Sequence, residues 1–247
     1  MIWLGIDTAN APLSVALVKD GKTLIEITQN IKLTHSVGAM PAIEELFERV
    51  QLKPTDIDAI AVSEGPGSYT GVRIGVSIAK TLAWSLKKPL VGVSSLKTLA
   101  ANVSMFNGLI CPLVDARRQN VYTALYEGTT LEEVMEDTHE HIDELLIKLK
   151  MFDRPVLFVG SDVELYKEHI EERIGSLAIY APMSQSLPRA SEIIRLAEAN
   201  FENQLATVSN AINQNRKRVK LVLIAGPSSS GKTTTAKKLA VYLQTYG

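Results

Sequence analysis

A glycine-rich stretch, Ser63–Gly75 (SEGPGSYTGVRIG), constrains the fold more than any other part of this chain. The run before it, Ile57–Val62, has the apolar character of a buried strand, and Val72–Leu86 has the apolar spacing of a helix. The sequence therefore predicts a strand, a glycine loop and a helix in succession. Such a junction lets the backbone approach a phosphate group and lets a helix N-terminus face an anion. A tight turn between a strand and a helix is built in the same way, so these residues alone leave a ligand site and a purely structural turn equally open.

The composition is that of a globular protein with one large or two small domains. The 247 residues are 46% hydrophobic and 21% charged, which excludes disorder of the whole chain. A net charge of −1 provides no overall basic surface for nucleic acid or membranes. The single cysteine, Cys111, cannot form an intramolecular disulfide, which favours a reducing, cytoplasmic compartment. The opening MIWLGIDTA has neither the basic start of a signal peptide nor the length of a membrane span.

Asp7 ends the first of three strands that are predicted to open the chain. These strands are Ile2–Ile6, Ala11–Val18 and Thr23–Thr28, and Asp20-Gly21 favours a hairpin between the last two. An aspartate at the end of a strand can hold a metal, can face a phosphate-bound cation, or can simply cap the turn. The residues alone leave these interpretations open.

A helix is predicted over Thr34–Val50, with His35 in its first turn. Two histidines four residues apart on a helix share a face and can bind one metal ion. The residue four positions after His35 is Ala39, so this pair is missing. We therefore interpret His35 as a helix-start residue and predict no metal site.

The second half of the chain opens with the same pattern as the first. A predicted strand, Leu109–Val114, leads into Asp115 and a turn, and a second strand, Val121–Tyr126, follows. Asn107-Gly108 marks the predicted boundary between two lobes. Further on we predict a solvated acidic face in the first part of Leu131–Lys150, a strand at Val156–Val159, and helices at Ile142–Lys150, Val163–Ile174 and Ala190–Phe201.

Four stretches occur in one order over about residues 1–203: IDTANAPLSVAL, THS at the head of the first helix, SEGPGSYTGVRIG, and LVDARRQNVYTALYEG. Together they resemble the TsaB family, the bacterial paralogues of the catalytic subunit TsaD in synthesis of the tRNA modification N6-threonylcarbamoyladenosine (t6A37). The resemblance implies an α/β fold of the actin-like, RNase H-like kind, with two lobes built on mixed sheets. It places the lobes at 1–107 and 108–203. Members also resemble peptidases of family M22, but no residues here support proteolysis.

The resemblance implies a non-catalytic scaffold subunit that is not an enzyme and needs no cofactor. Its implied partners are a TsaD-like catalytic subunit, a TsaE-like ATPase that binds the pair, and tRNA, reached indirectly through the complex. The sequence leaves open whether the chain forms a homodimer when the partner is absent. The apolar stripe of each first-lobe helix could also belong to the hydrophobic core instead of an interface. The candidate interface residues lie on the first-lobe helices and are His35, Met40, Ile43, Phe47, Arg73, Val76, Lys80 and Trp84. The candidate remnants of a phosphate site are Asp7, Gly65, Gly67, Gly71 and Asp115.

The C-terminal segment departs from that family. After a predicted polar linker at 204–218, residues 219–247 resemble the start of a P-loop domain of the uridine kinase type. Gly226–Thr233 matches the Walker A pattern, in which glycine N–H groups and a lysine hold phosphates and Thr233 binds Mg²⁺. The nucleotide-binding candidates are Gly226, Gly231, Lys232 and Thr233, with ATP and Mg²⁺ as the ligands. A P-loop enzyme needs further strands, so we expect Val219–Ala225 and the helix Thr234–Leu243 to form a truncated, loosely ordered fragment.

Two enzymatic alternatives remain beside the scaffold hypothesis. One is a nucleoside or nucleotide kinase that uses the Walker loop, and the missing downstream strands argue against it. The other is an actin-like sugar kinase or ATPase that uses Asp7 and the glycine loop, for which the chain is short. Nucleotide binding by residues 1–203 would separate the last of these from the scaffold.

Overall fold

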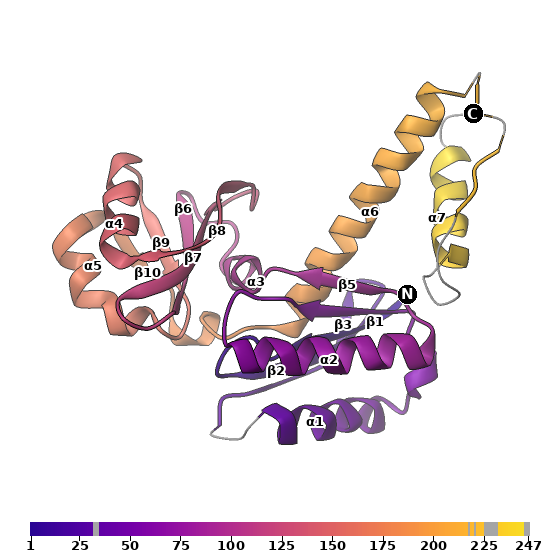
Figure 1. The fold of residues 1–247 in the computed structure, drawn as a ribbon, viewed down its shortest axis with the longest axis horizontal. Coiled ribbons are helices and arrows are strands. Elements are labelled where there is room, and N and C mark those ends of the chain that lie inside the picture. The colour runs from indigo at the N-terminus through magenta and orange to yellow at the C-terminus, as the bar shows by residue number, and fades with distance from the viewer. Residues whose placement is uncertain (32–34, 217, 220, 225–231, 245–247) are drawn as a thin grey trace.

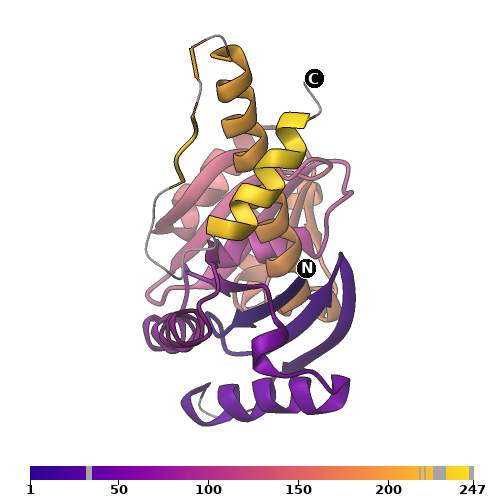
Figure 2. The same cartoon turned by 90° about the vertical axis from the view of Figure 1, so that its right-hand side faces the viewer.

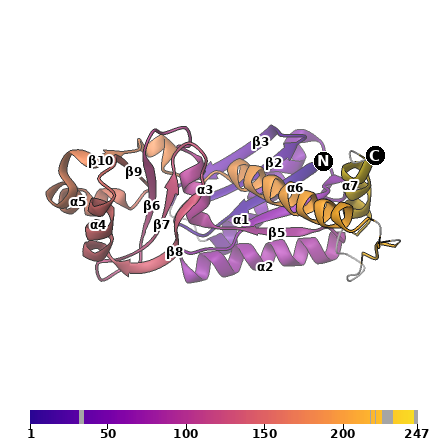
Figure 3. The ribbon, with the colours of Figure 1, turned by 90° about the horizontal axis from the view of Figure 1, so that it is seen from above.

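Two five-stranded sheets form two lobes that lie side by side along the long axis of the molecule (Figures 1 and 3). The structure is a computed structural model, and it describes residues 1–31, 35–216, 218–219, 221–224 and 232–244. The first sheet has the order β3-β2-β1-β4-β5 and the second the order β10-β9-β6-β7-β8. Each sheet opens with an antiparallel three-strand meander and adds parallel strands at the other side of its first strand. The duplicated pattern predicted from the sequence is therefore present.

The first sheet is covered by helices on both faces. Its strands are β1 (Ile2–Asp7), β2 (Leu13–Lys19), β3 (Lys22–Gln29), β4 (Ala59–Ser63) and β5 (Leu90–Val93). One face packs on α1 (His35–Val50) and α2 (Tyr69–Leu86), and the other on α3 (Ser95–Ala101) and α6 (Ala190–Gln214) (Figure 1). Side chains alternate along a strand, so in β1 Leu4 and Ile6 join the α1–α2 side and Trp3 joins the α3–α6 side.

The second sheet carries its own helices on its outer face. Its strands are β6 (Leu109–Asp115), β7 (Asn120–Glu127), β8 (Glu133–His141), β9 (Val156–Val159) and β10 (Ala178–Tyr180). The outer face packs on α4 (Ile142–Met151) and α5 (Lys167–Ile174), and the inner face joins the core around α3 and α6. Single-turn 3₁₀ helices η1–η4 lie at Pro54–Asp56, Val163–Tyr166, Gly175–Leu177 and Met183–Gln185. One continuous core thus joins the lobes.

Two strands were not predicted. Strand β8 lies in the acidic segment that the sequence analysis assigned to a solvated face, and most of its residues are exposed. It is an edge strand held by backbone pairing with β7, and an edge strand needs no apolar alternation. Strand β10 is only Ala178–Tyr180 and pairs with β9 at the opposite edge.

The helix α6 differs from its prediction in both length and position. It continues to Gln214, so most of the segment predicted as a linker at 204–218 is helical. It also packs on the first sheet rather than within the second lobe, because Ala190, Ile193, Ile194 and Ala197 are buried against that face. A Cβ on Gly5 of β1 would lie 2.5 Å from the carbonyl oxygen of Ala190, so the glycine permits this close approach. The helix covers the sheet because the sheet would otherwise expose an apolar face.

The C-terminal helix α7 (Lys232–Gln244) lies beside the far half of α6 (Figure 2). Lys238 and Tyr242 both bond the Glu202 carboxylate, and Leu239 is buried. The expected strand at Val219–Ala225 is wrong for the described residues 221–224, which are in no sheet. The predicted helix at Thr234–Leu243 is present within α7, and α6 is its packing neighbour. Gly226 and Gly231 lie outside the described residues, as do the side chains of Lys232 and Thr233.

Candidate partner surface and glycine junction

Three glycines spaced four residues apart form one face of the glycine loop and α2. Added Cβ atoms on Gly67 and Gly71 would lie 2.3 Å from the Ala9 oxygen and 2.1 Å from the Thr8 oxygen. A Cβ on Gly75 would lie 2.3 Å from the Thr8 hydroxyl oxygen. Residues four apart share a helix face, so this pattern lets the turn after β1 pack directly on the α2 backbone. Gly67 and Gly71 are required by contact between two backbone segments, and Gly75 makes room for the Thr8 side chain.

Hydrogen bonds fasten the same contact. The Ser68 N–H donates to the Ala9 carbonyl at 2.7 Å, and the Thr8 hydroxyl donates to the Gly71 carbonyl at 2.7 Å. Nε2 of His35 lies 2.8 Å from the Asn10 carbonyl oxygen, so α1 is tied to the turn as well. The loop therefore lies closed on the β1–β2 turn, which corresponds to the structural one of the two interpretations that the sequence left open.

Asp7 is fully buried beneath this junction. Its Oδ1 accepts the Ala9 N–H at 2.9 Å, whereas its Oδ2 has no hydrogen-bond partner among the described residues. Burial raises the pKa of Asp7 to about 6, against smaller lowering contributions from the Ala9 N–H and the Ser63 hydroxyl. A carboxylate in this position is costly, because desolvation disfavours its charged form.

We expect Asp7→Asn to stabilise the chain near neutral pH. The pKa of Asp7 is about 6 in the folded chain, whereas the ordinary pKa of an aspartate is 3.8. Between pH 3.8 and about pH 6 the folded chain therefore binds more protons than the unfolded chain. Stability therefore falls as the pH rises from about 4 to about 6, and the loss persists above that range. The variant should be more stable at pH 7.5 by up to about 3 kcal/mol and should lose the slope. Urea unfolding from pH 4 to 8 measures this, with exposed Glu172→Gln as control; an unchanged slope would contradict the assignment to Asp7.

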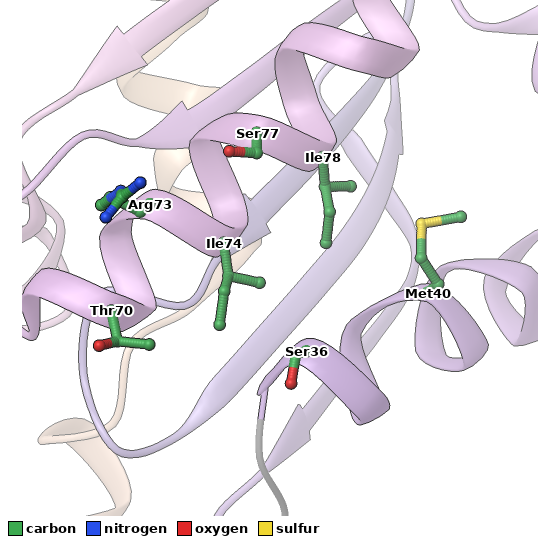
Figure 4. Close-up of a pocket in the computed structure, with 7 residues that line it drawn as sticks. All are labelled: Ser36, Met40, Thr70, Arg73, Ile74, Ser77 and Ile78. Atoms are coloured by element: carbon green, nitrogen blue, oxygen red, sulfur yellow. The ribbon is translucent and has the colours of Figure 1, made fainter.

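The outer sides of α1 and α2 frame an open groove (Figure 4). Ile74 and Ile78 of α2 point toward the gap, and Met40 and Ser36 of α1 line its other side. This hollow encloses about 440 Å³, and a second one of about 430 Å³ continues between the same helices. Met40 lines both hollows, so the two adjoin at this residue of α1. The second hollow is mainly apolar, with Ile43, Phe47, Leu82 and Leu86 among its walls.

Seven of the eight predicted interface residues divide into two groups, and the eighth, His35, is half-buried against the Asn10 carbonyl. Met40, Arg73, Lys80 and Trp84 are exposed, and the Trp84 side chain is 78% exposed. Ile43 and Phe47 belong to the core below the groove, and Val76 packs against it, so these three are not free surface residues. The side of α2 that faces the sheet carries small residues, namely Gly71, Gly75, Ala79 and Ala83. These residues let the helix lie close to the sheet, so that larger side chains beside them, such as Val76, also pack against the core.

Several residues of this surface were missed. Val37 of α1 and Tyr69 of α2 are large and exposed, and Ile74 and Ile78 line the groove. The four-residue spacing of glycine and alanine in α2 was the available signal. It identifies the sheet-facing side, and the opposite side then follows from the helix period.

The predicted phosphate-site residues are only partly brought together. Gly67 and Asp115 line one cavity between the lobes, whereas Asp7 is buried and does not line it. Gly65 is buried, with a left-handed φ of +100° at the start of the loop. Oδ1 of Asp115 accepts the Tyr166 hydroxyl at 2.6 Å and the Arg117 N–H at 3.0 Å. Within the described residues, no cluster of His, Cys, Asp and Glu side chains is arranged to hold a metal ion.

Comparison with known proteins decides the family. A family model described as TsaD, tRNA N6-adenosine threonylcarbamoyltransferase, matches residues 23–223. The tRNA threonylcarbamoyladenosine biosynthesis protein TsaB of Bacillus subtilis is 46% identical over 200 residues, which are 80% of this chain and 87% of that protein. The chain belongs to the TsaB family. The predicted resemblance is therefore confirmed.

Two further similarities place this member of the TsaB family among its relatives. The tRNA N6-adenosine threonylcarbamoyltransferase of B. subtilis is 37% identical over 109 residues, but these are 38% of this chain and only 32% of the transferase. A crystal structure from Pseudomonas aeruginosa, of a protein with similarity to the peptidase YeaZ, superposes with a TM-score of 0.69 at 23% identity. It covers 82% of this chain and 92% of that chain, and it confirms the two-lobe actin-like fold. None of the described helices combines the length and apolarity that crossing a membrane requires.

Proposed function

We propose that this chain is a non-catalytic subunit of t6A synthesis that binds a TsaD-like catalytic subunit through the surface of α1 and α2. The observation that carries the proposal is the 46% identity to B. subtilis TsaB over most of both chains. The groove between α1 and α2 supports it, because an apolar hollow between two helices and an exposed tryptophan on one of these helices are both typical of a protein interface.

Three features support a scaffold rather than a transferase. Ala39 stands where the resemblance implies the second histidine of a metal pair, and its side chain is buried. Asp7, the implied phosphate-facing carboxylate, lies beneath the closed glycine junction. The similarity to the B. subtilis transferase also covers only about a third of that protein.

The surface has the composition that a stable pairing needs. Trp84 offers a large apolar side chain, while Arg73 and Lys80 place cations on the same side of α2. Tryptophan and arginine at the centre of a patch contribute most of the binding energy in many interfaces. We propose that a TsaE-like ATPase binds the resulting pair, that tRNA is engaged by the assembled complex, and that two copies of this chain use the same surface when the partner is absent. The complex is proposed to act in the cytoplasm.

We expect t6A synthesis to depend on this chain without the chain carrying the chemistry. The measurement is t6A formed on tRNA by the purified TsaD-like and TsaE-like proteins of the same cell, supplied with threonylcarbamoyl adenylate as the donor, with and without the full-length chain. Synthesis should fall at least 10-fold without it, and the chain alone should form none. Co-purification of the tagged chain with the TsaD-like protein is measured in parallel. Full synthesis without the chain, or t6A formed by the chain alone, would overturn the proposal.

A further inference from the structure

The charge of this chain is distributed unevenly along the sequence. Residues 1–202 contain 19 lysines and arginines and all 27 acidic residues, which gives this part a net charge of −8. Residues 203–247 contain the other seven lysines and arginines and no acidic residue, which gives them a net charge of +7. The overall net charge of −1 therefore conceals a strongly basic segment beside an acidic remainder. Such an asymmetry is typical of a segment that binds a polyanion.

The basic segment forms an arm that stands clear of the two sheets, and we call residues 203–247 the basic arm. Its described parts include the far half of α6 and all of α7, which lie side by side beyond the lobes (Figures 1 and 2). The near half of α6 packs on the face of the first sheet opposite to α1 and α2. The basic arm and the proposed partner groove thus belong to opposite faces of the first sheet.

Three cations of the basic arm are exposed, and none of the three forms an ion pair with a described residue. Arg216 and Arg218 follow the C-terminal end of α6, and Lys237 lies in α7. Three more cations of the arm have side chains outside the described residues, namely Lys217, Lys220 and Lys232. Because the last acidic residue of the chain is Glu202, the arm holds no carboxylate side chain of its own to neutralise them.

Lys238, by contrast, holds α7 against α6. Its ammonium group bonds the Glu202 carboxylate and lies 5.1 Å from the centre of the Phe201 ring. This contact fixes α7 at the level of Glu202, and the end of α6 at Gln214 lies about 18 Å further along the helix at 1.5 Å per residue. The exposed cations of the basic arm therefore spread over a length that covers several phosphates of a nucleic-acid backbone.

The uncharged side chains of the basic arm also suit a phosphate backbone. Three exposed amide side chains, those of Asn203, Gln204 and Gln214, lie on the far half of α6. Amide and hydroxyl groups donate to phosphate oxygens beside lysine and arginine in most nucleic-acid interfaces. A surface of cations and amides without carboxylates has the composition expected for contact with a nucleic-acid backbone.

We propose that the basic arm binds the phosphate backbone of tRNA directly, through Arg216, Arg218 and Lys237 and without reading the base sequence. That the RNA is tRNA rests on the proposed function, whereas the attraction of the arm for phosphate rests on its charge. The acidic remainder of the chain repels RNA, which confines the contact to the arm. Because the arm extends from the face opposite to the partner groove, the chain can hold tRNA and a TsaD-like subunit at the same time.

The test measures binding of the full-length chain to a fluorescently labelled tRNA transcript that reads an ANN codon. Fluorescence anisotropy gives the affinity between about 50 and 200 mM KCl, because neutralised phosphates release counterions and make binding depend on salt. A triple variant with Arg216→Gln, Arg218→Gln and Lys237→Gln should bind at least 10-fold more weakly at the lower salt concentration. The slope of log affinity against log salt concentration should decrease by about 3, since each phosphate contact contributes about 1.

A matched control removes three charges from the lobes instead of the basic arm. Lys19→Gln, Lys22→Gln and Lys150→Gln change three exposed lysines and lower the net charge of the chain by the same amount. This control should change the affinity for tRNA less than twofold, and equal weakening by the two triple variants would contradict a site on the arm. Circular dichroism and thermal unfolding show whether each variant is folded, and Arg216→Lys with Arg218→Lys should retain most of the binding.

Two other partners of a basic arm are outcomes of the same test. Leu221 and Leu223 of the arm are exposed, so vesicles of phosphatidylcholine and phosphatidylglycerol are used to measure binding to an anionic membrane. Binding to these vesicles that depends on the three cations, without such binding to tRNA, would overturn the proposal. Self-association that depends on them, seen by light scattering without tRNA binding, would overturn it in favour of the acidic part of a second copy.

The proposed function is measured separately on the same variants. Co-purification with the TsaD-like protein should be unchanged by the three substitutions in the basic arm, because the arm and the groove belong to opposite faces. A wild-type chain that binds tRNA through the arm but does not co-purify with that protein would contradict the proposed partner and leave the arm proposal standing. Full affinity of the arm variant for tRNA would contradict the arm proposal and leave the proposed partner untouched.

Discussion

Gly71→Ala is expected to lower the free energy of unfolding by about 2 kcal/mol, although alanine is the better helix former. Helix propensity alone predicts a gain of about 1 kcal/mol for this change inside α2. The added Cβ would lie 2.1 Å from the Thr8 carbonyl oxygen, which is backbone and cannot rotate away. Overpacking of this kind costs about 3 kcal/mol, so the contact outweighs the propensity.

Urea unfolding followed by circular dichroism measures the effect of Gly71→Ala. The control is Ser77→Ala on the exposed side of the same helix, for which a change within about 0.5 kcal/mol is expected. Stabilisation by Gly71→Ala would show that the turn after β1 does not pack on α2 as described. The glycine spacing would then need another explanation.

Trp84→Ala is expected to weaken binding of the TsaD-like subunit at least 30-fold while leaving the fold intact. Truncating a central tryptophan costs an interface about 2 kcal/mol or more, which corresponds to this factor. The same side chain is 78% exposed in the free chain, so its loss should change the free energy of unfolding by less than about 0.5 kcal/mol. Titration of the purified partner by calorimetry or surface plasmon resonance measures the affinity.

The neighbouring exposed residue offers a matched control for Trp84. Ser85→Ala alters the next position of α2 and should leave affinity within twofold, whereas Lys80→Glu should weaken it by reversing a charge on the same side as Trp84. Met40→Glu tests the α1 wall of the groove in the same assay. Unchanged affinity for Trp84→Ala, Lys80→Glu and Met40→Glu together would place the partner on another surface.

The glycine junction explains why one motif fits two functions. A strand, a glycine loop and a helix can cradle a phosphate, but here Gly67, Gly71 and Gly75 bring the β1–β2 turn against the helix backbone. The loop therefore positions α2 rather than a ligand beside Asp7. The N–H groups of Tyr69 and Thr70, in the first turn of α2, have no acceptor among the described residues, and both residues line the cavity between the lobes.

Local sequence patterns predicted most of the elements of this chain. The residues of β9 were predicted with their observed bounds, and α1, α2 and α4 to within a few residues, because their apolar character is strong. The edge strands β8 and β10 were missed, since a strand held mainly by backbone pairing leaves little trace in side-chain pattern. The packing of α6 on the first sheet was also missed, because an apolar stripe on a helix does not indicate which of two sheets the helix will cover.

The sequence by itself determined the family, the duplicated strand pattern and the two helices of the proposed partner surface, since these depend on local order and on four recognisable stretches. Only the tertiary structure decided that Ile43 and Phe47 are core, that the glycine loop closes over Asp7, and that Asn10 and Arg117 share one cavity. The reason is physical. Periodicity reports which side of an element is apolar, whereas burial, close backbone contact and unpaired polar groups depend on which distant elements meet there.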